Sequence, residues 1–91
     1  MTIIVAGKLI LKEGTRDAFI NASRKAILQA RMLDACEDFS VSPDALDENR
    51  VNIFEKWISQ GSLTEFRQSG PNNDSFSFVE YFDVHEYELN T

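Results

Sequence analysis

The sequence has few of the residues that build covalent or metal-centred sites. It holds one cysteine, Cys36, and one histidine, His85, among 91 residues. An intrachain disulfide is therefore impossible, and no cluster of ligands has the spacing that a metal site requires. We expect no metal and no cofactor.

Positively charged residues are also scarce. Nine Lys and Arg stand against 15 Asp and Glu, which gives a formal net charge of −6. Binding to nucleic acid or to an anionic membrane surface depends on clustered cations, so the composition argues against both partners. The four glycines are scattered along the chain rather than gathered in a phosphate-binding loop, so no nucleotide cofactor is indicated.

The sequence has no charged start followed by a long apolar run. We therefore expect no signal peptide and no membrane span. The single cysteine suits a reducing compartment, and the cytoplasm is the expected location.

Aromatic residues, in contrast, are plentiful. Seven Phe, two Tyr and one Trp can fill a core or line a pocket for a flat ligand. A chain of this length, residues 1–91, is expected to form a single domain that buries only about 60–65% of its unfolded surface. Self-association is one way in which such a small domain gains stability.

The first half of the chain predicts a strand, a helix and a hairpin. Residues 2–11, "TIIVAGKLIL", are apolar on both alternating faces, which is typical of a strand buried from both sides. A helix follows from an N-cap at Thr15 to about Leu33, because apolar residues recur at helical spacing. Residues 36–42 and 50–57 alternate as strands and are joined by a short, turn-rich segment, so they form a hairpin.

The second half predicts a shorter helix over 59–69, with Leu63 and Phe66 as its apolar anchors. The segment "GPNND", residues 70–74, ends this helix and opens a loop. The remaining residues, 75–89, are strand-like and aromatic, and we place a final strand from about Val84 to Leu89. The order β-α-β-β-α-β is the α+β, ferredoxin-like layout, in which two helices cover one face of an antiparallel sheet.

This layout leaves the other face of the sheet bare. The first strand is apolar on both faces, and Phe54 lies opposite Ile53 and Trp57 on the third strand. A monomer rarely exposes a large apolar patch, so we expect a second copy of the sheet to pack against it in a two-fold homodimer.

Four segments resemble the antibiotic biosynthesis monooxygenase family, within the dimeric α+β barrel superfamily. They are "IIVAGKLILKEG", the helix that opens with Phe19, "ACEDFSV" with Cys36 and Phe39, and "NRVNIFEKWIS". The last segment matches the family's aromatic-Glu-x-Trp pattern through Phe54, Glu55 and Trp57. "LDA" stands where the family commonly has Glu-Pro-Gly before the cysteine, and Ile53 stands where some members have Asn.

The resemblance implies a dimeric barrel with a pocket between sheet and helices. For some members it also implies oxygenation of phenols or quinols without metal or flavin, with the residue at the position of Trp57 contacting the substrate. Related haem-degrading enzymes use an axial histidine on or after the second helix. No histidine occurs between Ser59 and Phe76, so haem is not expected.

Three residues are the candidates for catalysis. Glu55 shares a strand face with Trp57, and a carboxylate on an apolar face must be hydrogen-bonded or have a raised pKa. Glu55 is thus either the structural partner of the indole N–H, or one half of an interchain salt bridge, or a proton acceptor for a phenol. Trp57 is either a core residue or a stacking platform, and His85 either a surface residue or a general base.

Five further residues are candidates for substrate binding: Phe19, Ser23, Phe39, Tyr81 and Arg31. Ser23 has a simpler alternative, a hydrogen bond back to the carbonyl of Phe19. The hypothesis that we favour is a cofactor-independent monooxygenase acting on a small aromatic. An isomerase or lyase of small polar metabolites, using Arg31 and Glu55, and a non-catalytic ligand-binding dimer are the alternatives.

Overall fold

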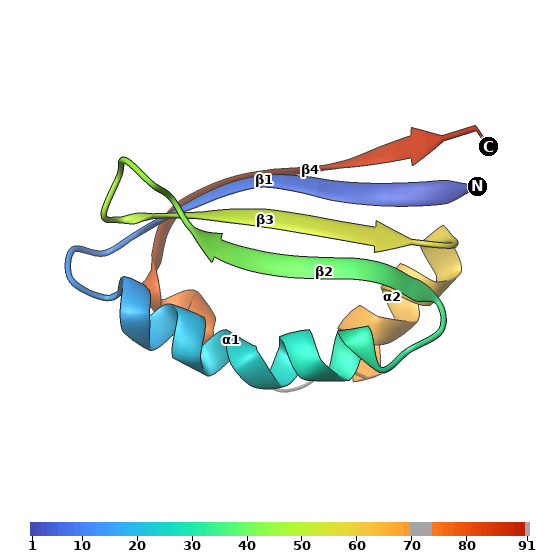
Figure 1. The fold of residues 1–91 in the computed structure, drawn as a ribbon, viewed down its shortest axis with the longest axis horizontal. Helices are drawn as coiled ribbons and strands as arrows, with labels where there is room; N and C mark the ends of the chain where they lie inside the picture. Colours follow the sequence, from blue (N-terminus) through green and yellow to red (C-terminus); the bar gives the residue numbers. More distant parts are fainter. Residues whose placement is uncertain (70–73, 91) are drawn as a thin grey trace.

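The computed structural model describes residues 1–69 and 74–90, which form one antiparallel sheet with helices on one side (Figure 1). The strands are β1 (Thr2–Leu11), β2 (Cys36–Pro43), β3 (Arg50–Trp57) and β4 (Val79–Leu89). The helices are α1 (Arg16–Arg31), α2 (Gln60–Ser69) and a 3₁₀ helix, η1 (Asp74–Phe78). The strand order is β2-β3-β1-β4, so the expected ferredoxin-like fold is confirmed.

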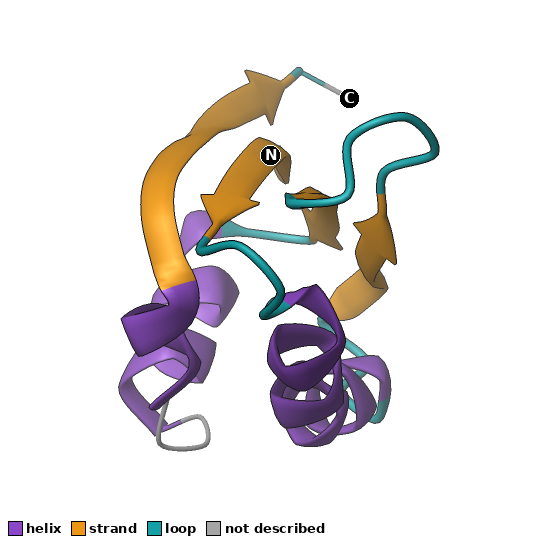
Figure 2. Ribbon diagram, turned by 90° about the vertical axis from the view of Figure 1, so that its left-hand side faces the viewer, coloured by secondary structure: helices purple, strands orange, loops and turns teal. Residues whose placement is uncertain are grey.

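The helices cover one face of the sheet and leave the other bare (Figure 2). Residues paired across antiparallel strands point to the same face, and Val5 pairs with Glu55 on one side and Glu86 on the other. Val5 is buried, so this row of three residues lies on the face that the helices cover. Ala6, Phe54 and His85 form the adjacent row, which lies on the bare face.

The core lies between the sheet and the helices in two clusters. One cluster gathers under α2 and the end of α1, and the other under the start of α1. The first consists of Ile3, Val5, Ala30, Cys36, Phe39, Trp57 and Leu63, and the second of Leu9, Leu11, Phe19 and Val51. Trp57 and Leu63 have no exposed surface at all, so they fix α2 against the sheet.

Helix α1 follows the sequence prediction closely, with two differences at its ends. It ends at Arg31 rather than at about Leu33. Thr15 is the N-cap residue, but its side chain makes no capping hydrogen bond; its hydroxyl donates instead to the carbonyl of Lys12 at 2.6 Å. Within the helix, the Ser23 hydroxyl donates to the carbonyl of Phe19 at 2.9 Å, as the simpler alternative predicted.

Strands β1 and β4 approach each other closely at Gly7. Its φ is +154°, which L side chains rarely adopt, and a Cβ added there would lie 2.0 Å from the carbonyl oxygen of Asp83. Only glycine fits this position, because the obstructing atoms belong to the backbone of β4.

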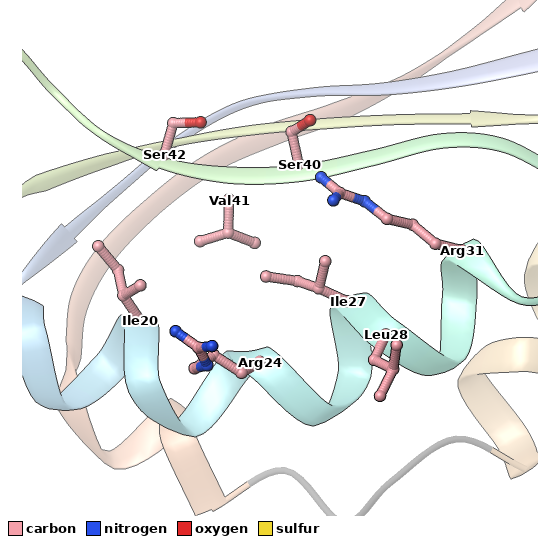
Figure 3. A pocket seen from close by; sticks show the side chains of 8 residues that line it. All are labelled: Ile20, Arg24, Ile27, Leu28, Arg31, Ser40, Val41 and Ser42. Carbon is pink, nitrogen blue, oxygen red and sulfur yellow. The ribbon is translucent and has the colours of Figure 1, made fainter.

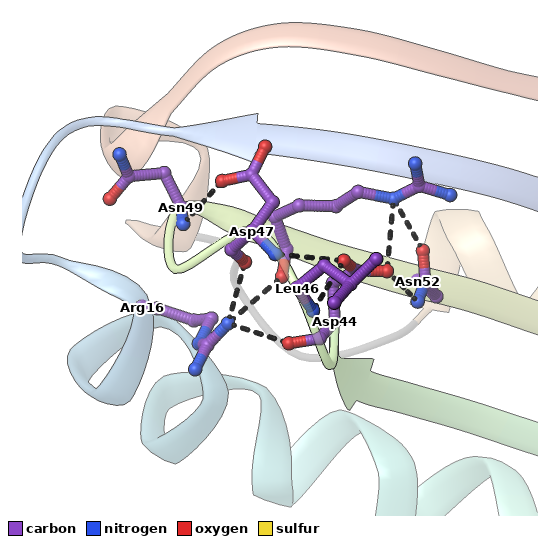
Figure 4. A network of polar contacts seen from close by, with 7 residues as sticks. Arg16, Asp44, Leu46, Asp47, Asn49 and Asn52 are labelled. Atoms are coloured by element: carbon purple, nitrogen blue, oxygen red, sulfur yellow. Dashed lines mark hydrogen bonds and ion pairs between the residues drawn. The ribbon is translucent and has the colours of Figure 1, made fainter.

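The loop between β2 and β3 is held by a polar network (Figure 4). The Arg16 guanidinium donates from Nη1 to the carbonyls of Asp44 and Asp47, at 3.2 and 2.9 Å, and ties the start of α1 to this loop. The Asp44 carboxylate accepts hydrogen bonds from Asn52 and from the amides of Leu46 and Asp47. These bonds, with the Asn52 bond first, lower the pKa of Asp44 to about 2.

The C-terminal third differs most from the sequence prediction. Within the strand-like segment 75–89, β4 begins at Val79, five residues before Val84, and η1 occupies the residues before it. The predicted loop "GPNND" lies outside the described residues except for Asp74, where η1 begins. Among the helices that the structure describes, none has the length and apolar character needed to cross a membrane.

Candidate functional site

The candidate site centres on a hydrogen bond between Trp57 and Glu55. Both side chains point to the helix-covered face of β3, because they are two residues apart on a strand. The indole Nε1 of Trp57 donates to Oε1 of Glu55 at 2.9 Å. This bond gives the buried N–H its partner and fixes one oxygen of the carboxylate.

Two further aromatic rings pack around Trp57 on the apolar side of this pair. The ring centroid of Trp57 lies 5.1 Å from that of Phe66 on α2 and 6.4 Å from that of Phe39 on β2. Phe39 and Phe66 are themselves 5.8 Å apart, and all these distances suit tilted or edge contacts between rings. Trp57 is 0% exposed, so no ligand reaches its ring in this arrangement.

The Glu55 carboxyl lies in an apolar setting with a few charges nearby. Burial raises its pKa above the ordinary value, and this effect outweighs the Trp57 N–H and the Arg67 guanidinium, which both lower the pKa. Arg67 on α2 pairs with Glu86 on β4, with 2.8 Å between Nη1 and Oε2. The paired arginine holds the pKa of Glu86 below its usual range.

His85 and Tyr81 lie on the opposite face of the sheet from Glu55. They pair in register with Ala6 and Ile10 of β1, on the face without helices. The His85 Nε2 lies 2.6 Å from Oδ1 of Asp83; the His85 side chain is largely exposed and that of Asp83 partly exposed. The structure therefore separates these two candidates from the Glu55–Trp57 pair.

The remaining candidates are spread along α1. Phe19 is buried in the second core cluster, and the hydroxyl of the buried Ser23 is occupied by the Phe19 carbonyl. Arg31 is exposed and donates from Nε to the carbonyl of Phe39 at 2.9 Å. Of the sequence candidates, the structure thus places Trp57 and Phe39 next to Glu55.

Sequence reasoning missed the polar neighbours of this site, Arg67 and Glu86. Glu86 shares the alternation of Val84, which is partly buried against the core, and that parity was a usable signal that Glu86 faces the helices. Arg67 gave no comparable signal, because its partner lies 19 residues away and depends on how α2 sits over β4.

Among the residues that the structure describes, hollows lie near the helices, and Glu55 and Trp57 do not line the two described next. A groove of about 370 Å³ lies between α1 and β2, and a hollow of about 300 Å³ lies beside α2, where Phe66 forms part of its wall. In residues 1–69 and 74–90, no group of three or more His, Cys, Asp or Glu is placed to hold a metal ion.

The chemistry available at this site is proton transfer. A carboxylate whose pKa is raised by burial binds a proton more tightly than an exposed one, and so accepts it more readily from a weakly acidic hydroxyl. The Trp57 N–H holds one oxygen of this carboxylate in place.

Comparison with known proteins gives one family and one fold. The family model of antibiotic biosynthesis monooxygenases matches residues 2–82. A search of curated proteins finds no match.

Solved structures show the same fold at low identity. A candidate antibiotic biosynthesis monooxygenase from Nitrosomonas europaea superposes with a TM-score of 0.85 at 15% identity, covering 94% of this chain and 88% of that one. Another candidate of that name, from Chloroflexus aurantiacus, gives a TM-score of 0.82 at 21% identity, with 100% and 95% covered. A conserved protein from Methanosarcina mazei gives 0.81 at 19% identity, with 99% and 94% covered.

Proposed function

Because this chain belongs to the antibiotic biosynthesis monooxygenase family, we propose that it is a cofactor-independent monooxygenase of a small aromatic quinol, phenol or anthrone-like compound. The observation that carries the proposal is the Glu55 carboxylate, which is partly buried on the same strand face as Trp57 and has a pKa raised by that burial. Family membership supplies the reaction class, and this carboxylate supplies the group that starts the reaction.

The substrate provides the electrons in this reaction. A hydroquinone and O₂ give a hydroxyquinone and water, so one oxygen atom enters the ring and the other leaves as water. The protein must remove the hydroxyl proton, because the resulting anion gives up electrons to O₂ more readily than the neutral phenol. Glu55 accepts that proton. Because its pKa is raised, the difference in pKa between the Glu55 carboxyl and a phenol hydroxyl of pKa about 10 is smaller than for an exposed glutamate.

Trp57 acts as a positioning residue in this proposal. It has no exposed surface, so it does not stack on the substrate in the arrangement described. Its N–H instead orients the Glu55 carboxylate, and Phe66 and Phe39 keep water away from the apolar side of the pair.

The proposal includes a homodimer formed through the bare face of the sheet. Several apolar side chains lie there with much of their surface exposed: Phe54 at 38%, Tyr81 at 57%, Tyr87 at 51% and Leu89 at 41%. Ile4, Ala6 and Ile10 of β1 lie between them in register. A two-fold packing of two such faces would remove this surface from water.

Oxygen uptake with a panel of reduced naphthoquinones tests the proposed activity. We expect uptake above the rate of spontaneous oxidation for at least one member of the panel. Trp57→Phe should lower kcat about tenfold, because the carboxylate loses its orienting donor, whereas His85→Gln on the opposite face should leave kcat unchanged.

Uptake at the background rate with every quinol would refute the monooxygenase proposal. The non-catalytic ligand-binding alternative would then be favoured. The isomerase alternative is not favoured, since Arg31 lies at the groove beside β2, which Glu55 does not line.

A further inference from the structure

The groove between α1 and β2 has the character of a second binding site, separate from Glu55 (Figure 3). One face of α1 forms its wall, because Ile20, Arg24, Ile27 and Arg31 recur every three or four residues. Val41 of β2 points into the groove from the other side, whereas the hydroxyls of Ser40 and Ser42 point away from it. Apolar and cationic side chains therefore alternate along the groove.

We propose that this groove binds a small amphipathic anion, with an aromatic or aliphatic body and one carboxylate or sulfonate group. Ile20, Ile27 and Val41 are partly buried and offer an apolar surface to the body of the ligand. Arg24 and Arg31 lie on the same helix face, seven residues or about 10 Å apart, and offer the charge.

Both arginines have guanidinium N–H groups available to a ligand. Arg31 uses only Nε, for the Phe39 carbonyl, which holds its guanidinium against β2 and leaves both Nη groups for a ligand. Among the hydrogen bonds and ion pairs of the described residues, none involves Arg24. Bidentate contact between guanidinium and carboxylate is among the strongest polar contacts in proteins.

The edge of β2 adds a backbone donor. The amide and carbonyl of Phe39 bond to side chains, Asp38 and Arg31, and therefore face away from β3. In an antiparallel pair this direction alternates, so the amide of Val41, two residues on, also faces outward. An anion in the groove would meet this N–H as well as the guanidinium groups.

Charge and size point to a small anion as the occupant. The whole chain has a net charge of −6, yet the residues that line the groove include two arginines and no carboxylate. A volume of about 370 Å³ is within the range of pockets for small molecules, about 300–1,000 Å³. The site shares no lining residue with the Glu55–Trp57 pair, so this proposal does not depend on the monooxygenase activity.

Two dyes of similar shape test the proposal on the intact protein. 8-Anilinonaphthalene-1-sulfonate carries an anionic group, and N-phenyl-1-naphthylamine is its neutral counterpart. We expect the anionic dye to bind more tightly, and Arg24→Gln with Arg31→Gln to raise its Kd about tenfold while the neutral dye is little affected. Lys25→Gln is the matched control, because Lys25 is an exposed neighbour on α1 that does not line the groove.

Amide chemical shifts locate the dye. We expect the amide signals of Ile27 and Val41 to shift on titration of the wild type with the anionic dye. The same shifts are expected in Arg24→Gln alone, because this variant keeps the hydrogen bond between Arg31 and β2. Shifts confined to the bare face of the sheet, or equal Kd values for both dyes, would overturn the proposal. Shifts at the groove that follow protein concentration without dye would also overturn it, because a second copy would then be the occupant.

Discussion

Trp57 donates its indole N–H to Glu55 at 2.9 Å, across two positions of the same strand. The carboxylate occupies a face where its neighbours in register are Val5 and Phe39, both buried. A carboxylate in such a place costs stability when it is ionised, and the single indole bond offsets only part of that cost. An apolar residue at position 55 would leave the buried indole N–H without an acceptor, so the carboxylate has a structural role as well as the catalytic role that we propose for it.

Glu55 should make the protein less stable as the pH rises. The pKa of Glu55 in the folded state is raised above the ordinary 4.5. The contribution of Glu55 to the free energy of unfolding is therefore complete below pH 4.5 and is lost as the pH rises through the folded-state pKa. Glu55→Gln keeps an oxygen for the Trp57 N–H and carries no charge, so we expect it to be more stable than the wild type at pH 7, by on the order of 1 kcal/mol.

Urea unfolding at pH 4 and pH 7 measures this difference, with the exposed Glu13→Gln as the control. A Glu55→Gln protein that is less stable than the wild type at pH 7 would contradict a raised pKa.

Gly7 and Gly61 should respond in opposite ways to alanine. Gly7→Ala places a methyl group 2.0 Å from the Asp83 carbonyl at a φ that alanine avoids, so we expect a loss of about 3 kcal/mol or more. Gly61 lies in α2 with its nearest foreign atom at 3.9 Å, so Gly61→Ala should gain about 0.5–1 kcal/mol. Thermal unfolding measures the change in stability of each variant. Equal changes in the two variants would mean that β4 does not approach β1 as described.

Asp44 should stabilise the protein in the opposite pH range to Glu55. Its folded pKa is lowered from 3.8 to about 2, so its contribution is present above pH 4 and is lost as the pH falls from about 4 to about 2. Asp44→Asn should flatten the unfolding free energy across this range, whereas the exposed Asp34→Asn should leave the slope unchanged. An unaltered acid slope in Asp44→Asn would show that the loop network does not hold the carboxylate.

The bare face of the sheet should govern self-association. Phe54 lies near the middle of that face, between Ser40 and Ala6 in register, so Phe54→Glu should convert a dimer to a monomer. Leu46→Glu is the matched control, because Leu46 is 95% exposed in the loop between β2 and β3. Sedimentation equilibrium from 1 to 100 μM reads the outcome, and a monomeric wild type throughout would refute the proposed dimer.

The hydrophobic pattern was enough to predict the parts of this fold that depend on local periodicity. Strand β3 has the bounds that alternation predicted, and the pairing of Glu55 with Trp57 followed from their shared parity. The start of β4 was harder to place within the strand-like segment 75–89, because Phe76, Phe78 and Phe82 make it apolar without a clear period.

Contacts between elements that are distant in the chain could not be predicted from the sequence, for a different reason. The Arg67–Glu86 pair and the groove beside Arg24 depend on the distance and angle at which a helix crosses the sheet. Side-chain packing sets those quantities, and a periodic pattern does not contain them. The same limit explains why His85 and Tyr81 were grouped with Glu55 as candidates, although the structure places them on the other face.

The most direct test of the proposed function is the rate of oxygen uptake by Glu55→Gln with a reduced naphthoquinone that the wild type oxidises. Glutamine keeps the Trp57 bond and the packing but cannot accept a proton, so we predict that kcat falls 10²- to 10⁴-fold while the protein stays folded. Glu86→Gln, which changes a neighbouring carboxylate on the same face, should retain most of the activity. A Glu55→Gln protein that takes up oxygen at the wild-type rate would contradict the account.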